Sequence, residues 1–513
     1  MKTRGLFLSA LLMGAVMAGC SQDEVMNEDN QRDIKKSENF IAVNIVAPTD
    51  FGSRGTSGEN DYLAGSAAEN EVKDAWFVFF AENGRQVDAV PATELKWSDG
   101  TGTIEKISTA VLVLENPQEW PTQVVALLNT GFTESDLNGK SLAHVQAMAA
   151  DYRDYQNFVM SNSVYNDGEK NLYATPLSAA NICDTKDKAL DNPVSIPVER
   201  VLAKVEASFD DNFKVVDPDV TPQLDGEDVA FVPTITGMAL VNTNPRSYLL
   251  KNIEGVENFI AWPAWNDPTN FRSYWAMSVG PDPNGVLGYE TLSYDDVVTK
   301  GITDDFMTYT HENTVASIGS GDLAIKLLVT AQFKASGTEE YQTIIKYNGT
   351  YFTVDGLKNY LNAQYFASIK HGEDNSNEWR NHMAFVSAGT DNEWEVKLAL
   401  VADGETPVPA ANDGTDLNDI LTSINSKTMS QWTDGKCYYY VDVEHFGTDG
   451  AEIGVVRNHW YDISLKSIKG LGTPVFDPTK DITPDKPEEE NYYVAAEIKI
   501  LKWKVVSQEV DLQ

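Results

Sequence analysis

The sequence predicts an all-β protein made of two antiparallel β-sandwiches joined by short crossover helices. Three observations support this class. Apolar residues recur with a period of two in short runs, aromatic residues reach 10% of the chain, and clusters of Gly, Asn, Asp and Pro separate the runs. With 513 residues, 42% of them hydrophobic, the chain has enough apolar material for two to four domains.

The strongly negative net charge of the chain excludes some classes of binding partner. The chain has 39 basic and 77 acidic residues, which gives a net charge of −38. Such a surface repels phosphate backbones, so the sequence predicts no nucleic-acid partner. The six histidines and three cysteines are scattered along the chain. We therefore predict no metal and no other cofactor.

The first residues have the pattern of a targeting segment. Lys2 and Arg4 precede an apolar run of 12 residues, 6–17, which is too short to span a bilayer as a helix. Small residues then lead to Cys20, as a lipoprotein signal peptidase requires. We predict a signal peptide over 1–19 and a lipid on Cys20, which would anchor the chain to a membrane. The alternative is an ordinary secretory signal with a chance cysteine.

A strand and a loop follow the polar stretch that ends near residue 38. Ile41, Val43 and Ile45 share one face of the predicted strand 40–48, which Pro48 ends. The Gly/Ser-rich loop 50–58 contains a single Arg54, and such loops are easily cut by trypsin-like proteases. Cleavage between Arg54 and Gly55 is one interpretation of this loop. From the residues alone, a plain linker with an incidental arginine is the favoured one.

The middle of the chain supplies most of the predicted strands. Period-two or short apolar runs occur at 72–80, 110–114, 123–128, 323–329, 438–443 and 455–465. Helical spacing is sparse and is best at 142–148, 355–361 and 417–424. The strand-like run 198–208 leads into an acidic, proline-bearing connector that begins at Asp210. We therefore predict one sandwich over about 55–210 and a larger one over 211–473.

The C-terminal region combines a predicted hinge with an unusual strand. Residues 474–491 are charged and rich in proline, so we expect them to be extended and poorly packed. The apolar side of 497–513 changes face twice, which requires a bulge or a break. The segment is either a bent last strand of the second sandwich or an arm that pairs elsewhere. Its apolar residues are Ile498, Ile500, Leu501, Trp503, Val505, Val506, Val510 and Leu512.

Motifs of catalysis are missing from the sequence. It contains no GxxxxGK[ST], HExxH, GxSxG or CxxC. His459 lies in a strand-like pattern beside Trp460 and is expected to be a structural histidine. Cys183 and Cys437 are expected to be buried free thiols. The sequence therefore predicts that the protein is not an enzyme.

Several of these segments together resemble the Bacteroidetes fimbrillins, and most closely the major subunit of the minor-fimbria type. The resemblance rests on the lipobox at Cys20, the strand and Arg54 loop, and an ordered set of short motifs. The motifs are 198–205 (VERVLAKV), 271–275 (FRSYW), 351–357 (YFTVDGL) and 455–474 with the apolar segment 498–512 behind it. The acidic residues after Cys20 also resemble the signal that sends Bacteroidetes lipoproteins to the cell surface.

The resemblance implies two transthyretin-like sandwiches and assembly by protease-triggered donor-strand exchange. An outer-membrane lipoprotein precursor would lose its propeptide, residues 20–54, when an Arg-specific protease cuts after Arg54. The strand with Ile41, Val43 and Ile45 would leave. The hinge and donor strand, residues 474–513, of an identical subunit would then fill the groove head to tail. The resemblance thus implies a structural subunit of a cell-surface fimbria that supports adhesion, with anchor and tip subunits as further partners.

Two other functions compete with this interpretation. A surface glycan-binding lipoprotein of a polysaccharide-uptake system would use exposed tryptophans such as Trp262 and Trp265 as sugar platforms. In that case Arg54 is idle and the C-terminal segment stays in place. A glycosidase with paired carboxylates is the third option, and nothing local in the sequence supports it.

Overall fold

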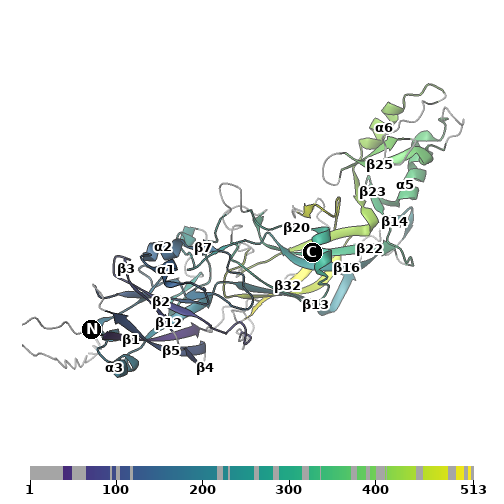
Figure 1. The fold of residues 1–513 in the computed structure, drawn as a ribbon. Coiled ribbons are helices and arrows are strands. Elements are labelled where there is room, and N and C mark those ends of the chain that lie inside the picture. Colours follow the sequence, from purple (N-terminus) through teal and green to yellow (C-terminus); the bar gives the residue numbers. More distant parts are fainter. Residues whose placement is uncertain are drawn as a thin grey trace, which may run out of the picture. The chain divides into compact units, whose positions relative to one another are not determined.

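The protein is described from a computed structural model (Figure 1), in which residues 38–513 form one compact unit. The structure describes residues 38–48, 65–92, 95–99, 104–115, 119–216, 223–228, 231–258, 265–280, 288–314, 323–335, 337–370, 378–388, 393–399, 411, 413–445, 454–482, 493–501 and 507–509.

The first sheet has nine strands, with the order β3-β2-β6-β8-β12-β1-β5-β4 and β11 paired to β6. β1, β12, β5 and β4 lie side by side in Figure 1. Buried side chains of β1, β2, β5, β6 and β12 form one core inside this sheet. The strands are β1 (Glu38–Pro48), β2 (Ala75–Phe80), β3 (Gln86–Ala92), β4 (Lys96–Asp99), β5 (Ile104–Glu115), β6 (Gln123–Leu128), β8 (Met160–Asn162), β11 (Thr175–Pro176) and β12 (Val194–Arg200).

The next two sheets face each other across the largest core. Alternating residues such as Val205, Leu327 and Ile463 point into it, as expected for strands with one buried face. The five-stranded sheet contains β21 (Phe306–Thr310), β13 (Ala203–Val216), β29 (Trp460–Lys469), β32 (Tyr493–Leu501) and β33 (Ser507–Glu509), in that order. The four-stranded sheet contains β16 (Phe231–Val241), β22 (Lys326–Ala335), β28 (Lys436–Asp442) and β30 (Thr473–Pro474), in that order.

A further sheet carries a separate core between residues 345 and 429. Trp379, Phe366 and Leu357 lie at its centre, and two helices and a hairpin surround it. The sheet contains β15 (Glu227–Asp228), β14 (Gln223–Leu224), β24 (Thr350–Thr353), β23 (Ile344–Tyr347) and β27 (Met429–Trp432). This region lies in the sequence between β22 and β28, which are paired neighbours in the four-stranded sheet.

Short ladders and helices complete the described chain. The ladders are β9 (Tyr165–Asn166) with β10 (Asn171–Leu172), β7 (Ala149–Ala150) with β17 (Ser247–Tyr248), β18 (Asn266–Asp267) with β19 (Arg272–Ser273), β20 (Leu292–Ser293) with β31 (Asp481–Ile482), and β25 (Met383–Ser387) with β26 (Trp394–Leu398). The α-helices are α1 (Glu134–Leu137), α2 (Leu142–Ala147), α3 (Lys186–Asp191), α4 (Tyr294–Lys300), α5 (Val354–Leu361) and α6 (Leu417–Asn425). None of the helices in the described ranges is long and apolar enough to cross a bilayer.

The connection between β16 and β20 also packs on the first sheet. Leu249, Leu250 and Trp275 join a core with Val78 of β2 and Leu127 of β6. Leu249, Leu250 and Trp275 lie in the long connection between β16 and β20. The connection therefore ties the first sheet to the C-terminal part of the chain through apolar contacts.

The prediction of an all-β fold with a few short helices is confirmed, and α2, α5 and α6 lie where the sequence placed helices. Other details were wrong. The run 198–208 is not one strand, because β12 ends at Arg200 and β13 begins in another sheet at Ala203. The predicted connector from Asp210 to residue 216 is part of β13. Residues 455–459 precede β29 instead of belonging to it.

Candidate functional site

β1 is an interior strand of the first sheet, between β5 and β12. It pairs antiparallel with β5 from Glu38, opposite Glu115, to Pro48, opposite Ile104. On its other side it pairs parallel with residues 194–197 of β12, so that Val43 lies opposite Val194. The β-branched residues of 41–46 favour the extended backbone. Removing β1 would therefore leave two strands of the sheet with an open gap between them.

The side chains of β1 belong to the core of that sheet. Ile41, Val43 and Ile45 are completely buried, in the alternating pattern that the sequence predicts. At about 1.5–3 kcal/mol for each such side chain, their burial contributes roughly 5–9 kcal/mol before the entropic cost is subtracted. The half-buried Asn44 lies on the other face, where its side chain bonds Thr109 of β5.

The second face of β1 is also covered in part. Helix α3 packs against β1, and Ala42 is as completely buried as its apolar neighbours. Just before α3, Cys183 and Phe40 exchange both backbone hydrogen bonds, at 2.7 and 2.9 Å. A strand that occupies this position is therefore enclosed on two faces near its beginning.

The segment that follows the predicted cleavage loop is fixed by a polar cluster. Glu69 is buried and accepts hydrogen bonds from the Tyr309 hydroxyl and the backbone N–H of Ser66. Burial opposes its ionisation, but these bonds and the nearby Lys204 and Arg200 outweigh it and lower the pKa of Glu69. Chain breakage before residue 65 would leave this cluster in place.

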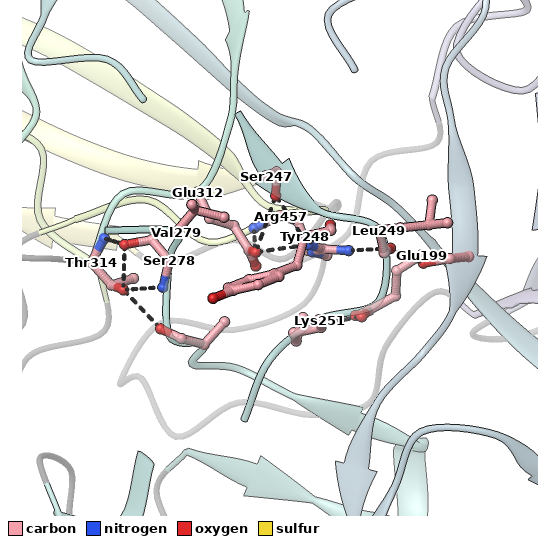
Figure 2. A network of polar contacts seen from close by, with 12 residues as sticks. Glu199, Ser247, Tyr248, Leu249, Lys251, Ser278, Val279, Glu312, Thr314 and Arg457 are labelled. Atoms are coloured by element: carbon pink, nitrogen blue, oxygen red, sulfur yellow. Dashed lines mark hydrogen bonds and ion pairs between the residues drawn. The ribbon is translucent and has the colours of Figure 1, made fainter. Parts of the chain in front are cut away.

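β12 carries a buried charge at its far end. Glu199 forms ion pairs with Lys251 Nζ at 2.8 Å and with Arg272 Nε at 2.9 Å, and each of the three side chains is at most 1% exposed. Lys251 also donates to the backbone oxygen of Ser273 at 2.7 Å. Burial lowers the pKa of Lys251, although Glu199 and Glu312 oppose this shift. Figure 2 shows Glu199 and Lys251 pointing toward each other.

A second buried pair lies beside the first (Figure 2). Arg457 and Glu312 are 2.8 Å apart, and both side chains are 1% exposed. Arg457 also donates to the backbone oxygens of Leu249 and Tyr248. Arg457, three residues before β29, is thereby bonded to the connection that covers the first sheet. Buried charges of this kind are tolerated only when they are paired and hydrogen-bonded.

Buried histidines lie in the same region. The backbone N–H of Tyr152 donates to His311 Nε2 at 3.0 Å, and the ring's Nδ1 lies 2.9 Å from the Asn244 oxygen. This arrangement fits a neutral ring that is protonated on Nδ1, and burial lowers the pKa of His311 to about 4. His459 is buried as expected of a structural histidine. Burial and the nearby His445, Arg272 and Lys251 lower its pKa well below the usual value.

The C-terminal segment pairs within its own chain. β32 lies antiparallel to β29, from Tyr493 opposite Lys469 to Leu501 opposite Trp460. β33 folds back on β32 and pairs at residues 507–509. The two strands confirm that 497–513 is not one continuous strand. The expected poor packing of 474–491 is wrong for residues 474–482, because Val475 and Ile482 are buried.

The predicted site residues fall into two groups. The structure places Ile41, Val43 and Ile45 in β1, and Ile498, Ile500 and Leu501 in β32. Cys20, Arg54, Gly55, Trp503, Val505, Val506, Val510 and Leu512 lie outside the described residues.

The buried Glu199–Lys251–Arg272 cluster and the buried Arg457–Glu312 pair were not predicted from the sequence. A usable signal was present, because Glu199 and Arg200 interrupt an apolar run and Arg457 lies within another of the motifs on which the resemblance rests. Their partners are remote in sequence, however, and only the fold brings Lys251 and Arg272 to Glu199.

Two other expectations need correction. Cys183 and Cys437 are both free, but only Cys437 is buried, and Cys183 is half-buried. Trp265 is not an exposed sugar platform, because it lies in the core between the first sheet and the connection that covers it. Trp262 lies outside the described residues.

The C-terminal region of the chain is similar to a known protein family. Residues 430–509 match the family model described as "Major fimbrial subunit protein type IV, Fimbrillin, C-terminal". The match runs from β27 to β33 and so includes the β29–β32 pairing. It confirms the predicted fimbrillin resemblance. No curated protein matched the sequence.

Solved structures of Bacteroidetes proteins are distantly similar. A putative cell adhesion protein from Parabacteroides distasonis is 12% identical, with 91% of this chain and 99% of that one covered and a TM-score of 0.39. The tip fimbrial protein Mfa3 from Porphyromonas gingivalis is 12% identical over 90% and 100%, with a TM-score of 0.30. The anchor protein Mfa2 from the same organism is 10% identical over 91% and 99%, with a TM-score of 0.24.

Proposed function

The chain carries a fimbrillin C-terminal region, and we propose that it is a structural subunit of a cell-surface fimbria that supports adhesion. The family match supports the structural role and gives no reason to expect catalysis. We further propose the finer assignment to the minor-fimbria major subunits. We also propose that the chain divides at about residue 210 into two sandwich domains, each with transthyretin-like topology.

The observation that carries the proposed assembly mechanism is the position of β1. It is an interior strand that supplies three buried side chains, and it precedes the loop that contains Arg54. Cleavage after Arg54 would detach β1 covalently from the sheet that it completes. Loss of the strand would expose unpaired backbone groups beside an apolar trough, which is a site for strand addition from another chain.

The C-terminal segment of a second subunit is the proposed replacement. Its predicted donor residues run from Ile498 to Leu512. Moving the whole segment gives up the pairing of β32 with β29, whereas moving only the residues after Leu501 gives up the shorter β32–β33 pairing. A head-to-tail contact of this type does not close on itself and therefore forms a filament. We propose that the precursor carries lipid on Cys20 at the outer membrane and that anchor and tip subunits end the filament.

Limited digestion with an Arg-specific protease tests this function. We expect an early cut after Arg54, release of the fragment that ends at Arg54, filaments in electron micrographs and an SDS-resistant ladder. Arg54→Lys is the matched variant, because it keeps the charge but removes the cleavage specificity, and it should remain monomeric. Cleavage at Arg54 that leaves only monomer would contradict the proposal, as would filament growth from Arg54→Lys.

The glycan-binding alternative loses one of the tryptophans on which it relied. Of its two proposed platform tryptophans, Trp265 is buried.

A further inference from the structure

We propose that the buried cluster of Glu199, Lys251 and Arg272 positions β12 as a wall of the groove that opens when β1 leaves. The inference rests on the proposed function and adds to it the residues that keep the empty groove in shape. These three residues act through β12 and do not touch an incoming strand.

The two halves of β12 are held differently. Residues 194–197 pair with β1. Within the described part of the chain, no second strand pairs with them. Residues 198–200 pair with β8 instead, and the Ser163 N–H bonds the Pro197 oxygen at the point where the halves meet. When β1 leaves, the first half of β12 loses its strand partner and depends on how firmly the second half is fixed.

The part of β5 that faces Asn44 to Val46 of β1 does not have this weakness. β5 pairs with β4 on the side away from β1, where Lys96 to Asp99 lie opposite Thr109 to Lys106. That part of β5 keeps a ladder after β1 has gone. β12 is therefore the wall whose position needs a second support.

The cluster supplies that support at Glu199. Its carboxylate is fully buried between two cations, and displacement of β12 would separate these charges in a region where unpaired charges are costly. Both cations belong to the connection that packs on the first sheet, where Leu249, Leu250 and Trp275 are buried. The cations are thus held by apolar packing that does not involve β1.

The experiment compares two isosteric changes in the full chain. Glu199→Gln removes the charge that faces Lys251 and Arg272, and Glu312→Gln removes the equally buried charge that faces Arg457 but does not lie on β12. Each protein is cut with the Arg-specific protease, and a fluorescent synthetic peptide of residues 38–48 is titrated into it. We expect Glu199→Gln to bind the peptide about tenfold more weakly than wild type, which is about 1.4 kcal/mol, and Glu312→Gln to bind within about twofold.

Amide hydrogen exchange of Val194, Ser195 and Ile196 provides a measurement that does not require polymerisation. We expect faster exchange in Glu199→Gln than in Glu312→Gln, before and after cleavage. Equal peptide affinity and equal exchange in the two variants would overturn the inference. If Glu199→Gln fails to fold, Lys251→Met is used, because it leaves Glu199 paired with Arg272 and should change both readings in the same direction by a smaller factor.

The outcomes separate the inference from the proposed function. Wild-type protein that is cut and binds the peptide but never forms filaments contradicts the proposed function, while the comparison of variants still decides the role of Glu199. Filament formation by Glu199→Gln at the wild-type rate, with unchanged exchange in β12, contradicts the inference alone.

Discussion

β1 and β32 are the first and last long strands of the described chain, and they are held in different ways. β1 has a strand on each side, four fully buried apolar side chains and a helix packed against it. β32 pairs with one sheet strand and is flanked by the short β33. The strand proposed to leave is therefore the better held of the two. A protease cut can sever β1 from the chain, but a replacement has to match its buried contacts.

The largest expected effect comes from a charge inside β1. Val43→Asp buries an unpaired carboxylate and should cost about 4 kcal/mol or more of the free energy of unfolding. Asn44→Asp, one residue later on the half-buried face, is the matched control and should cost about 1 kcal/mol or less. Chemical denaturation of the uncut proteins measures both. Similar losses for the two variants would show that β1 is not the tightly packed strand described above.

Acid should weaken the buried contacts of His311 with Tyr152 and Asn244. The pKa of His311 is lowered from 6.5 to about 4 in the folded protein, so its contribution to stability is complete above pH 6.5 and is lost as the pH falls toward 4. The loss is up to about 3 kcal/mol, because one pKa unit corresponds to about 1.4 kcal/mol.

His311→Gln is the control for this pH dependence. Glutamine can accept from the Tyr152 N–H and donate to the Asn244 oxygen without titrating. Urea unfolding of both proteins between pH 7 and pH 4 should show a shallower loss for the variant. Parallel curves would assign the acid sensitivity to other groups, including His459.

Removal of the C-terminal segment should have a smaller effect on stability. A chain that lacks residues 497–513 keeps the pairing of β29 with β13 and should lose about 2 kcal/mol while remaining folded. It should also form no filament after cleavage. Near-UV circular dichroism and thermal unfolding report the fold. Global unfolding of the truncated chain would show that β32 is a core strand and would reverse the comparison with β1.

The smallest expected effect is that of salt on assembly. Residues 1–54 contain six basic and seven acidic side chains, so a chain cut after Arg54 keeps a net charge of −37. Screening of this repulsion should speed filament growth severalfold between about 0.01 and 0.15 M salt. As a control, the free energies of unfolding of the uncut wild type and of uncut Asn44→Asp should change little over the same range of salt. Light scattering measures the growth rate. Slower growth at higher salt would indicate that attraction between charged surfaces drives assembly.

Local pattern in the sequence predicted much of the fold but little of its long-range pairing. The alternation in 40–48 identified the buried face of β1, and the spacing of 417–424 identified α6, because both depend on neighbouring residues. The parallel pairing of β1 with β12 joins residues about 150 positions apart, for which no local signal exists. The core around Trp379 was missed for the same reason, since its strands and helices alternate within what looked like one large sandwich.

The candidate site was predictable only in part. The three apolar residues of β1 follow from the period-two pattern, whereas Glu199 looked like one charge among many. Its role depends on its ion pairs with Lys251 and Arg272, which lie in the connection between β16 and β20. That connection packs on the first sheet only in the folded protein, so local sequence patterns do not predict these ion pairs.

The two walls beside β1 run in opposite directions, since β1 is parallel to β12 and antiparallel to β5. A guest strand inserted either way round would form one ladder of each kind. Backbone hydrogen bonding therefore does not choose the guest's orientation. The uniform head-to-tail direction of a filament must come from which side chains fit the buried positions of Ile41, Val43 and Ile45, and from the end at which the guest is tethered to its own subunit.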